Sequence, residues 1–334
     1  MRARVAECSA YDRTRMSYAE GAGLLARGTG PPVRSDQTMP HLVGAQAVEV
    51  RQQWQGESQG ATAVPLWPAV RPPVHWYAPQ SEAVLRLTDA LQVKQPKARR
   101  GEGAAKPPVE REPKRVHTEV WLVEQPTGGC TYLTAGIEAP GQEGVSGTAR
   151  GRWQFPPDDA GRAAPLPVVA LTDGARTMRR PWTERCGQPG PGILDGYHLD
   201  KKVGERLSMV ARPKQEKAVH VARLLDHRWH GRTDAALPDL RQDVQAKNPE
   251  PGAALGPYLE KPQAESIDYG HRQRAGKPLG SGRRDKGVDQ VLGARQQPQG
   301  MSWRPTGRKA LGILKVVELN QQWEQLWFPQ QAAA

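Results

Sequence analysis

The sequence predicts an α/β fold in which helices flank a mixed β-sheet. Five short runs of apolar and β-branched residues, all between positions 83 and 195, have the length and alternation of strands. The segments before and after these runs carry apolar residues at helical spacing instead. The chain also holds 35 Gly and 31 Pro, enough to end many short elements.

The strands are expected at residues 83–94, 118–123, 130–133, 165–173 and 192–195. In the first run, Val84, Leu87 and Leu91 stand among polar neighbours, as in a half-buried strand. The second and third runs flank a turn with two adjacent glycines, so the first three runs should form an antiparallel meander. The fourth run is the most hydrophobic of the five, and the fifth is short.

Residues 1–55 are expected to form an N-terminal helical region. A helix at 18–27 is followed by a break at 28–32, and Ser35 is a suitable N-cap for a second helix. Two short helices around a glycine-containing turn have the outline of a helix-turn-helix, and equally of an ordinary helical hairpin. Residues 56–80, rich in Pro, Gly and Trp, are expected to be a linker.

The rest of the chain should form one core that is interrupted by helices. Residues 81–199 would hold its first part, with all five strands. Residues 200–270 show helical spacing divided by several prolines, which predicts a helical insertion of short pieces. Residues 271–334 would complete the core, and their amphipathic stretch at 308–327 is expected to pack on it as a helix.

Charge and cysteine content narrow the class of protein. A formal net charge of +12 favours a polyanionic partner such as nucleic acid, although a basic composition also serves solubility. Cys8, Cys130 and Cys186 are too few and too scattered for a disulfide framework or a zinc site, which favours the reducing cytoplasm. No apolar run approaches the length of a membrane span, so no membrane partner is expected.

Three acidic residues stand where metal-dependent phosphoryl transfer needs them. Asp89 lies in the first strand, Asp173 ends the fourth, and Asp285 follows the glycine-rich turn at 279–282. A meander, a helix, a buried fourth strand and a short fifth one are the outline of an RNase H-like fold, whose mixed sheet can bring such acids together. Each acid also has a structural interpretation, as a polar strand-edge residue, a turn cap and a helix N-terminal acid respectively.

The expected cofactor is Mg²⁺, for which Mn²⁺ can substitute. Gathered carboxylates repel one another unless metal ions neutralise them, and Mg²⁺ prefers oxygen ligands. Two ions about 4 Å apart would activate the attacking oxygen and stabilise the leaving one. Asp195 and His198, just past the fifth strand, are auxiliary candidates. Asp195 is the alternative metal ligand; His198 would orient a phosphate or a carboxylate, or equally be a buried hydrogen-bonded histidine.

The chain resembles bacterial insertion-sequence transposases of the DDE type, close to the ISKra-like group. The resemblance runs from about residue 11 to residue 327, with a weaker patch at 136–164. The segments that carry it are 87–94, 169–176, 193–199, 275–282, 286–290 and 300–303. It implies an RNase H-like catalytic core with a helical insertion, dependence on divalent metal, and cutting and joining of transposon DNA ends. The family's three acids match Asp89, Asp173 and Asp285, and its Asp-aromatic-Tyr-His element matches Asp195 to His198.

The sequence departs from the family pattern at several positions. The third acid is normally glutamate, so Asp285 retracts the carboxylate by one methylene, and a misplacement of about 1 Å can cost on the order of a hundredfold in rate. Gly196 stands where the family has tryptophan, and Ala90 where it has glycine. Three prolines fall inside segments that should be helical, where each would cost about 3 kcal/mol: Pro238, Pro298 and Pro305.

Two functions are therefore expected. The first is a transposase, impaired by aspartate at the usual glutamate position, that acts on double-stranded DNA of transposon ends and target. By analogy it would form a homo-oligomer on DNA, in the bacterial cytoplasm at the nucleoid. The alternative is a catalytically inactive, decayed relative that only binds DNA. A host RNase H-like nuclease is disfavoured by the helical insertion and by the transposase-like turn.

Overall fold

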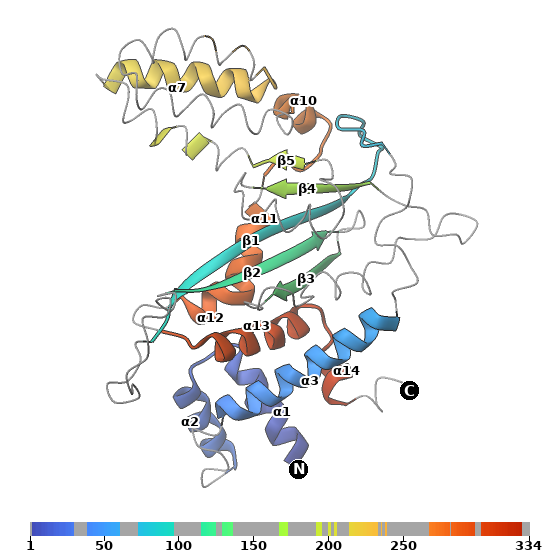
Figure 1. Cartoon of the computed structure of the whole chain (residues 1–334), viewed down its shortest axis with the longest axis vertical. Helices are drawn as coiled ribbons and strands as arrows, with labels where there is room; N and C mark the ends of the chain where they lie inside the picture. The colour runs from blue at the N-terminus through green and yellow to red at the C-terminus, as the bar shows by residue number, and fades with distance from the viewer. Residues whose placement is uncertain are drawn as a thin grey trace, which may run out of the picture.

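In a computed structural model of the chain, a mixed five-stranded sheet lies between two groups of helices (Figure 1). The structure describes residues 2–29, 39–60, 73–96, 115–124, 129–135, 167–172, 192–195, 200–201, 204–205, 214–232, 235, 238, 267–280, 282–297 and 302–328. The α/β class with a mixed sheet and flanking helices is confirmed.

The sheet has the strand order β3-β2-β1-β4-β5. Its strands are β1 (Val84–Lys94), β2 (Arg115–Glu124), β3 (Cys130–Ala135), β4 (Val168–Thr172) and β5 (Gly192–Leu194). The first three strands are antiparallel neighbours, as the meander predicted, whereas β4 runs parallel to β1 and β5 parallel to β4. All five expected strands are present, and β2 begins at Arg115, earlier than the expected residue 118.

Two apolar clusters lie on one face of the sheet, while the opposite face also buries apolar side chains such as Trp121 and Val123. Side chains two positions apart point to the same face of a strand, and directly paired residues share that face. Leu87 of β1 is paired with Leu122 of β2 and with Leu171 of β4, and all three are buried in one apolar cluster. Further along the same strand, Val93 belongs to a second cluster that α3 and α13 also enter.

A run of helices covers this face and contributes Val288, Val291 and Leu292 to the second cluster. It comprises α11 (Gly282–Val288), the π-helical turn η4 (Asp289–Gly293) and α12 (Ala294–Gln296). The helix α11 packs against β1 and β2. A Cβ atom on Gly287 would lie 3.7 Å from Leu122 Cδ2 and 3.4 Å from Tyr132 Cε1, which is ordinary van der Waals contact, so the helix lies directly on the sheet at this position. The Tyr132 hydroxyl donates to Gln290 Oε1 at 3.1 Å, which ties β3 to the same run.

The N-terminal helices pack against the C-terminal helix of the core. They are α1 (Arg2–Arg13), α2 (Tyr18–Thr29) and α3 (Met39–Gly60), and α3 packs along α13 (Pro305–Leu319). The expected helix at 18–27 is confirmed by α2. The expected cap Ser35 lies outside the described residues, α3 continues past the expected boundary at residue 55, and the helix-turn-helix remains a prediction.

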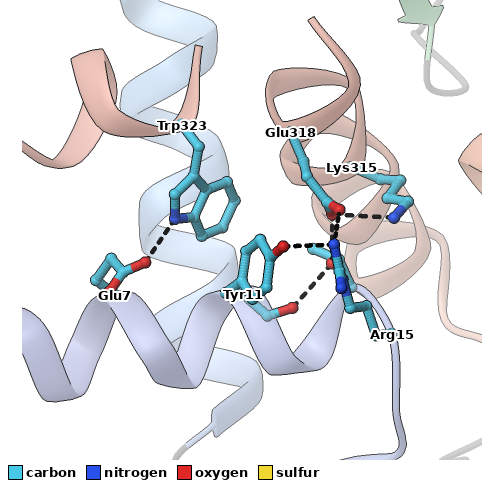
Figure 2. A network of polar contacts seen from close by, with 7 residues as sticks. Glu7, Tyr11, Arg15, Lys315, Glu318 and Trp323 are labelled. Carbon is cyan, nitrogen blue, oxygen red and sulfur yellow. Dashed lines mark hydrogen bonds and ion pairs between the residues drawn. The ribbon is translucent and has the colours of Figure 1, made fainter. Parts of the chain in front are cut away.

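Polar contacts hold α1 against the C-terminal helices (Figure 2). The Glu318 carboxylate accepts a hydrogen bond from Arg15 Nη2 at 2.5 Å and one from Lys315 Nζ at 3.0 Å. The Trp323 indole donates to Glu7 Oε1 at 2.7 Å. Glu318 is thereby held by one cation from its own helix and by one from the segment that follows α1.

At the other end of the sheet lie α7 (Lys214–Trp229) and α10 (Tyr269–Arg274) (Figure 1). The helix α7 falls within residues 200–270, where helices were expected, whereas α10 begins at the end of that range and extends beyond it. Part of the expected linker is anchored here: the Tyr77 hydroxyl accepts a hydrogen bond from the backbone N–H of Asp268 at 3.0 Å. The Tyr77 ring also stacks on His271, with ring centroids 4.5 Å apart.

The C-terminal segment corrects two expectations. The single helix expected at 308–327 is wrong: α13 ends at Leu319, and α14 (Trp323–Trp327) is a separate helix. The break has a tertiary cause, because the Asn320 side chain bonds both the backbone N–H and the carbonyl of Tyr132, each at 2.8 Å. Pro305 does not interrupt a helix; it begins α13, where its missing N–H is harmless.

No helix in the described part of the chain is long and apolar enough to span a membrane. Two of the three cysteines, Cys8 and Cys130, are exposed free thiols. Cys186 and Pro298 lie outside the described residues.

Candidate functional site

Asp89 lies in the middle of the sheet, on the face that carries the two apolar clusters. It is half-buried on β1 and is paired with Val120 of β2. Two positions separate it from Leu87 on the same strand, so both side chains belong to the same face. Leu122, which α11 approaches through Gly287, is paired with Leu87 and lies on this face as well. Asp89 therefore lies on the side of the sheet that α11 covers.

A row of three apolar residues crosses the parallel part of the sheet next to Asp89. Leu87 is paired with Leu171, and Leu171 is paired with Ile193. In the sequence, an aspartate follows each member of this row by two positions: Asp89, Asp173 and Asp195. Asp173 itself comes directly after the last residue of β4 and lies outside the described residues.

Asp285 lies in α11, in the helix that packs on β1 and β2. The structure thus brings the backbone of the expected third acid to the face of the sheet that carries Asp89. The π-helical turn η4 follows α11 directly. In a π-helical turn each backbone hydrogen bond spans five residues instead of four, and such single turns are frequent at functional sites.

Asp195 directly follows β5 and is completely buried. The glycine-rich turn that leads into α11 lies close to it: a Cβ atom on Gly280 would be 3.9 Å from Asp195 Oδ1. The carboxylate therefore faces the turn at which the resemblance placed the third acid. His198, the other auxiliary candidate, lies outside the described residues.

A buried polar cluster surrounds the end of β5. The Tyr269 hydroxyl donates to the Leu194 carbonyl at 2.6 Å. Arg228 of α7 forms a two-pronged ion pair with Asp200, with Nε 2.7 Å from Oδ1 and Nη2 2.9 Å from Oδ2, and its guanidinium lies 4.8 Å from the centre of the Tyr269 ring. These contacts link α7 and α10 to the strand that precedes Asp195.

The charges in this cluster act on one another. Burial, opposed by Arg228 and aided by the Asp195 and Asp200 carboxylates, raises the pKa of Tyr269 to about 12. Burial also raises the pKa of Asp200, against the lowering effect of Arg228, and Asp195 adds to the rise. The negative charge of Asp195 thus raises the pKa of both neighbours, and the buried cation Arg228 acts in the opposite direction.

Arg272 fixes the turn that faces Asp195. Its side chain is buried, its Nε donates to the Pro278 carbonyl at 2.9 Å, and its Nη1 donates to the Trp76 carbonyl at 3.0 Å. Lys277 also donates to the Ser81 carbonyl, just before β1. Two cations therefore bind the turn before α11 to the chain that leads into the first strand, and burial lowers the pKa of both.

The available donors suit a hard divalent cation. Asp89 and Asp195 offer carboxylate oxygens on one face of the sheet, and a helix that carries Asp285 covers that face. Within the described residues, no three His, Cys, Asp or Glu side chains are grouped so that they could hold a metal ion. Asp173, His198 and the side chain of Asp285 fall outside this statement.

Arg228 and Arg272 are the supporting residues that the sequence did not single out. Both stand in charged, proline-divided stretches where basic residues are common, and a local pattern does not distinguish a buried arginine from a solvated one. A weak signal exists for Arg228, which is followed directly by Trp229, a residue packed against the apolar cluster. Comparison of the chain with protein-family models, with curated proteins and with solved structures gives no match.

Proposed function

We propose that this chain is a DDE-type transposase with an RNase H-like core, in which Asp89, Asp173 and Asp285 bind the catalytic metal ions. The observation that carries the proposal is the row Leu87, Leu171 and Ile193, with an aspartate two positions after each member. Continuing the parallel register by two residues would bring Asp173 beside Asp89. The strand order β3-β2-β1-β4-β5, with only β2 antiparallel to the other described strands, supports the RNase H-like assignment.

The roles of the protein groups follow from their positions. Asp89 and Asp173 would hold metal from two adjacent strands, and Asp285 would approach from α11 above them. Asp195, buried at the end of β5, is the alternative ligand, since the shorter side chain of Asp285 reaches less far than the family's glutamate. When bound, Mg²⁺ would supply the positive charge that an in-line displacement at a phosphodiester requires.

Arg272 and Lys277 would act as positioning residues. They hold the turn before α11 to the segment before β1, and so set how α11 lies over Asp89. The formal charge of +12 would hold the double-stranded DNA through its phosphates.

The proposal is tested by cleavage and strand transfer on DNA ends taken from inverted repeats around the coding region, with Mg²⁺ or Mn²⁺. Asp89→Asn should lower the rate at least a hundredfold, because it removes a charged ligand from the site. Asp285→Glu should raise the rate, because it restores the length of the family's side chain. Asp289→Asn, at an exposed acid of the same helical run, is the matched control and should leave the rate within twofold.

A second function is favoured by the aspartate at position 285 and by the basic charge. In it the chain is a decayed relative that binds DNA without cutting it. This alternative holds if neither the natural chain nor Asp285→Glu cleaves, while both bind DNA with an affinity that falls steeply with salt. Robust turnover by the natural chain would exclude it.

A further inference from the structure

A large hollow lies at the opposite end of the molecule from Asp195, between α3 and α13. Its volume is about 1110 Å³, and the start of α2, the residue Pro96 after β1 and residues 302–304 complete its walls. Pockets for single small molecules commonly measure about 300–1,000 Å³. The hollow therefore has room for a ligand larger than one metabolite.

Among the described residues that line the hollow, the charged side chains are all basic. Arg51 of α3, Arg295 of α12, and Arg304 and Lys309 at the start of α13 line it, together with His41. None of the described residues that line it is Asp or Glu. Cations from three separate helices thus converge on one space, which calls for an anionic ligand.

Apolar side chains form much of the remaining wall. Val48 of α3 is 55% exposed, and it lines the hollow with Ala310 and Ile313 of α13. The rings of Tyr18 and Trp303 also contribute. A ligand that fits must therefore present an apolar or aromatic face beside its negative charges.

Arg295 links the basic part of the lining to the apolar and aromatic part. Its side chain is buried, its Nε donates to the Arg13 carbonyl at 3.1 Å, and its guanidinium lies 4.9 Å from the centre of the Trp303 ring. Burial lowers the pKa of Arg295, which means that the surroundings disfavour its charge. An anion bound in the hollow would offset that penalty.

We propose that this hollow binds a short stretch of single-stranded nucleic acid, with phosphates on the basic side chains and bases against the apolar wall. Positively charged grooves with aromatic and apolar platforms are the usual way in which proteins hold single strands. A duplex fits less well, because its bases are stacked inside and it presents mainly phosphate and sugar to a protein. The inference rests on the hollow and not on the proposed catalytic acids.

The test measures fluorescence anisotropy of a labelled oligothymidine of eight nucleotides with the full chain, in EDTA so that metal chemistry plays no part. Val48→Glu should weaken binding at least fivefold, because it places a negative charge on the apolar wall. Val219→Glu is the matched control, since Val219 lies on α7 and is 57% exposed. It makes the same change on a similarly exposed helical valine and should change binding by less than twofold.

A second pair of variants tests the basic side chains. Arg304→Ala/Lys309→Ala should make the fall of log affinity with log salt less steep by about 1.4, the value for two lost phosphate contacts on a single strand. Lys201→Ala/Arg274→Ala removes the same charge from exposed positions on the side of α7 and α10, and should leave the slope nearly unchanged. Circular dichroism and the melting temperature of each variant report whether it is folded.

Three results would overturn the inference. The first is equal weakening by the hollow variants and by their controls, which would mean binding over the whole basic surface. The second is a duplex of the same length that binds as tightly and responds equally to Val48→Glu. The third is an acidic peptide that binds with this sensitivity while the oligothymidine does not. Asp89→Asn should bind the oligothymidine normally, so failure of the catalytic proposal and failure of this one are distinguishable.

Discussion

At the end of the sheet that faces α3 and α13, the helices pack through a large aliphatic cluster, whereas at the β5 end a partly buried ion pair, Arg228 with Asp200, joins the rings of Trp229 and Tyr269 in holding α7 and α10. Leu311, Leu314 and Val317 of α13 are at most 2% exposed and pack in one cluster with Val43 and Val50 of α3. At the β5 end, by contrast, the contacts of Arg228 and Arg272 reach carboxylate and carbonyl oxygens.

The two ends contribute differently: the α3–α13 end mainly stabilises the fold, and the β5 end mainly fixes the positions of side chains. Apolar burial is non-directional and contributes most of the free energy of folding, so the α3–α13 end should dominate the stability of the chain. A buried ion pair contributes little net stability, because desolvation offsets its attraction, but it fixes distances and directions. The charged end borders Asp195 and the turn before α11, where geometry matters most for the proposed chemistry.

The largest effect on stability is expected from a cavity at the apolar end. Leu314→Ala should lower the free energy of unfolding by about 3 kcal/mol, because Leu314 is fully buried. Urea denaturation followed by tryptophan fluorescence measures it. Val219→Ala, at a valine that is 57% exposed on α7, is the control and should change stability by less than about 0.5 kcal/mol. Similar losses for both variants would remove the distinction between the two ends.

A smaller effect is expected at the charged end. Arg228→Leu should lower the free energy of unfolding by about 2 kcal/mol, less than a fully buried pair would lose, because the Asp200 side chain is 34% exposed. Arg232→Leu is the matched control: Arg232 also pairs with an aspartate, Asp226, but their side chains are 53% and 59% exposed. That variant should lose less than about 0.5 kcal/mol. If the two losses are equal, burial of the pair is unimportant.

The smallest effect is a pH dependence at Glu318. Burial by itself would raise the pKa of this carboxyl, but the hydrogen bonds from Arg15, Lys315 and Thr14 outweigh it and lower the pKa below 4.5. Its stabilisation is therefore complete above pH 4.5 and is lost as the pH falls through the lowered pKa.

At neutral pH, Glu318→Gln should accordingly be about 1 kcal/mol less stable than the natural chain. When the pH is lowered, the free energy of unfolding should fall less in Glu318→Gln than in the natural chain. Urea denaturation at neutral pH and at about pH 3.5 compares the two. Glu324→Gln, at an exposed acid of α14, is the control and should follow the natural chain. An unchanged acid dependence in Glu318→Gln would show that this contact does not hold α1 to α13.

The strands were predictable because their signal is local. The run of apolar residues among polar neighbours, including Val84, Leu87 and Leu91, placed β1 to within one residue of its observed start. The break after Leu319 was not predictable, because its cause is the bonding of Asn320 to Tyr132, 188 positions away. Pro305 was read as a helix breaker, since nothing in the local sequence showed that it would be the first residue of α13.

Within the candidate site, the acids and the strands that carry them could be predicted from the sequence, because an acid in or after an apolar run is a local pattern. The alignment of Leu87, Leu171 and Ile193 in one row depends on register between strands, which long-range packing sets. The same holds for the Tyr269 hydroxyl on the Leu194 carbonyl, 75 positions away, and for Arg272 on the Trp76 carbonyl, 196 positions away. Such contacts form only when the whole sheet assembles, so folding in three dimensions, and no local preference, places the acids relative to one another.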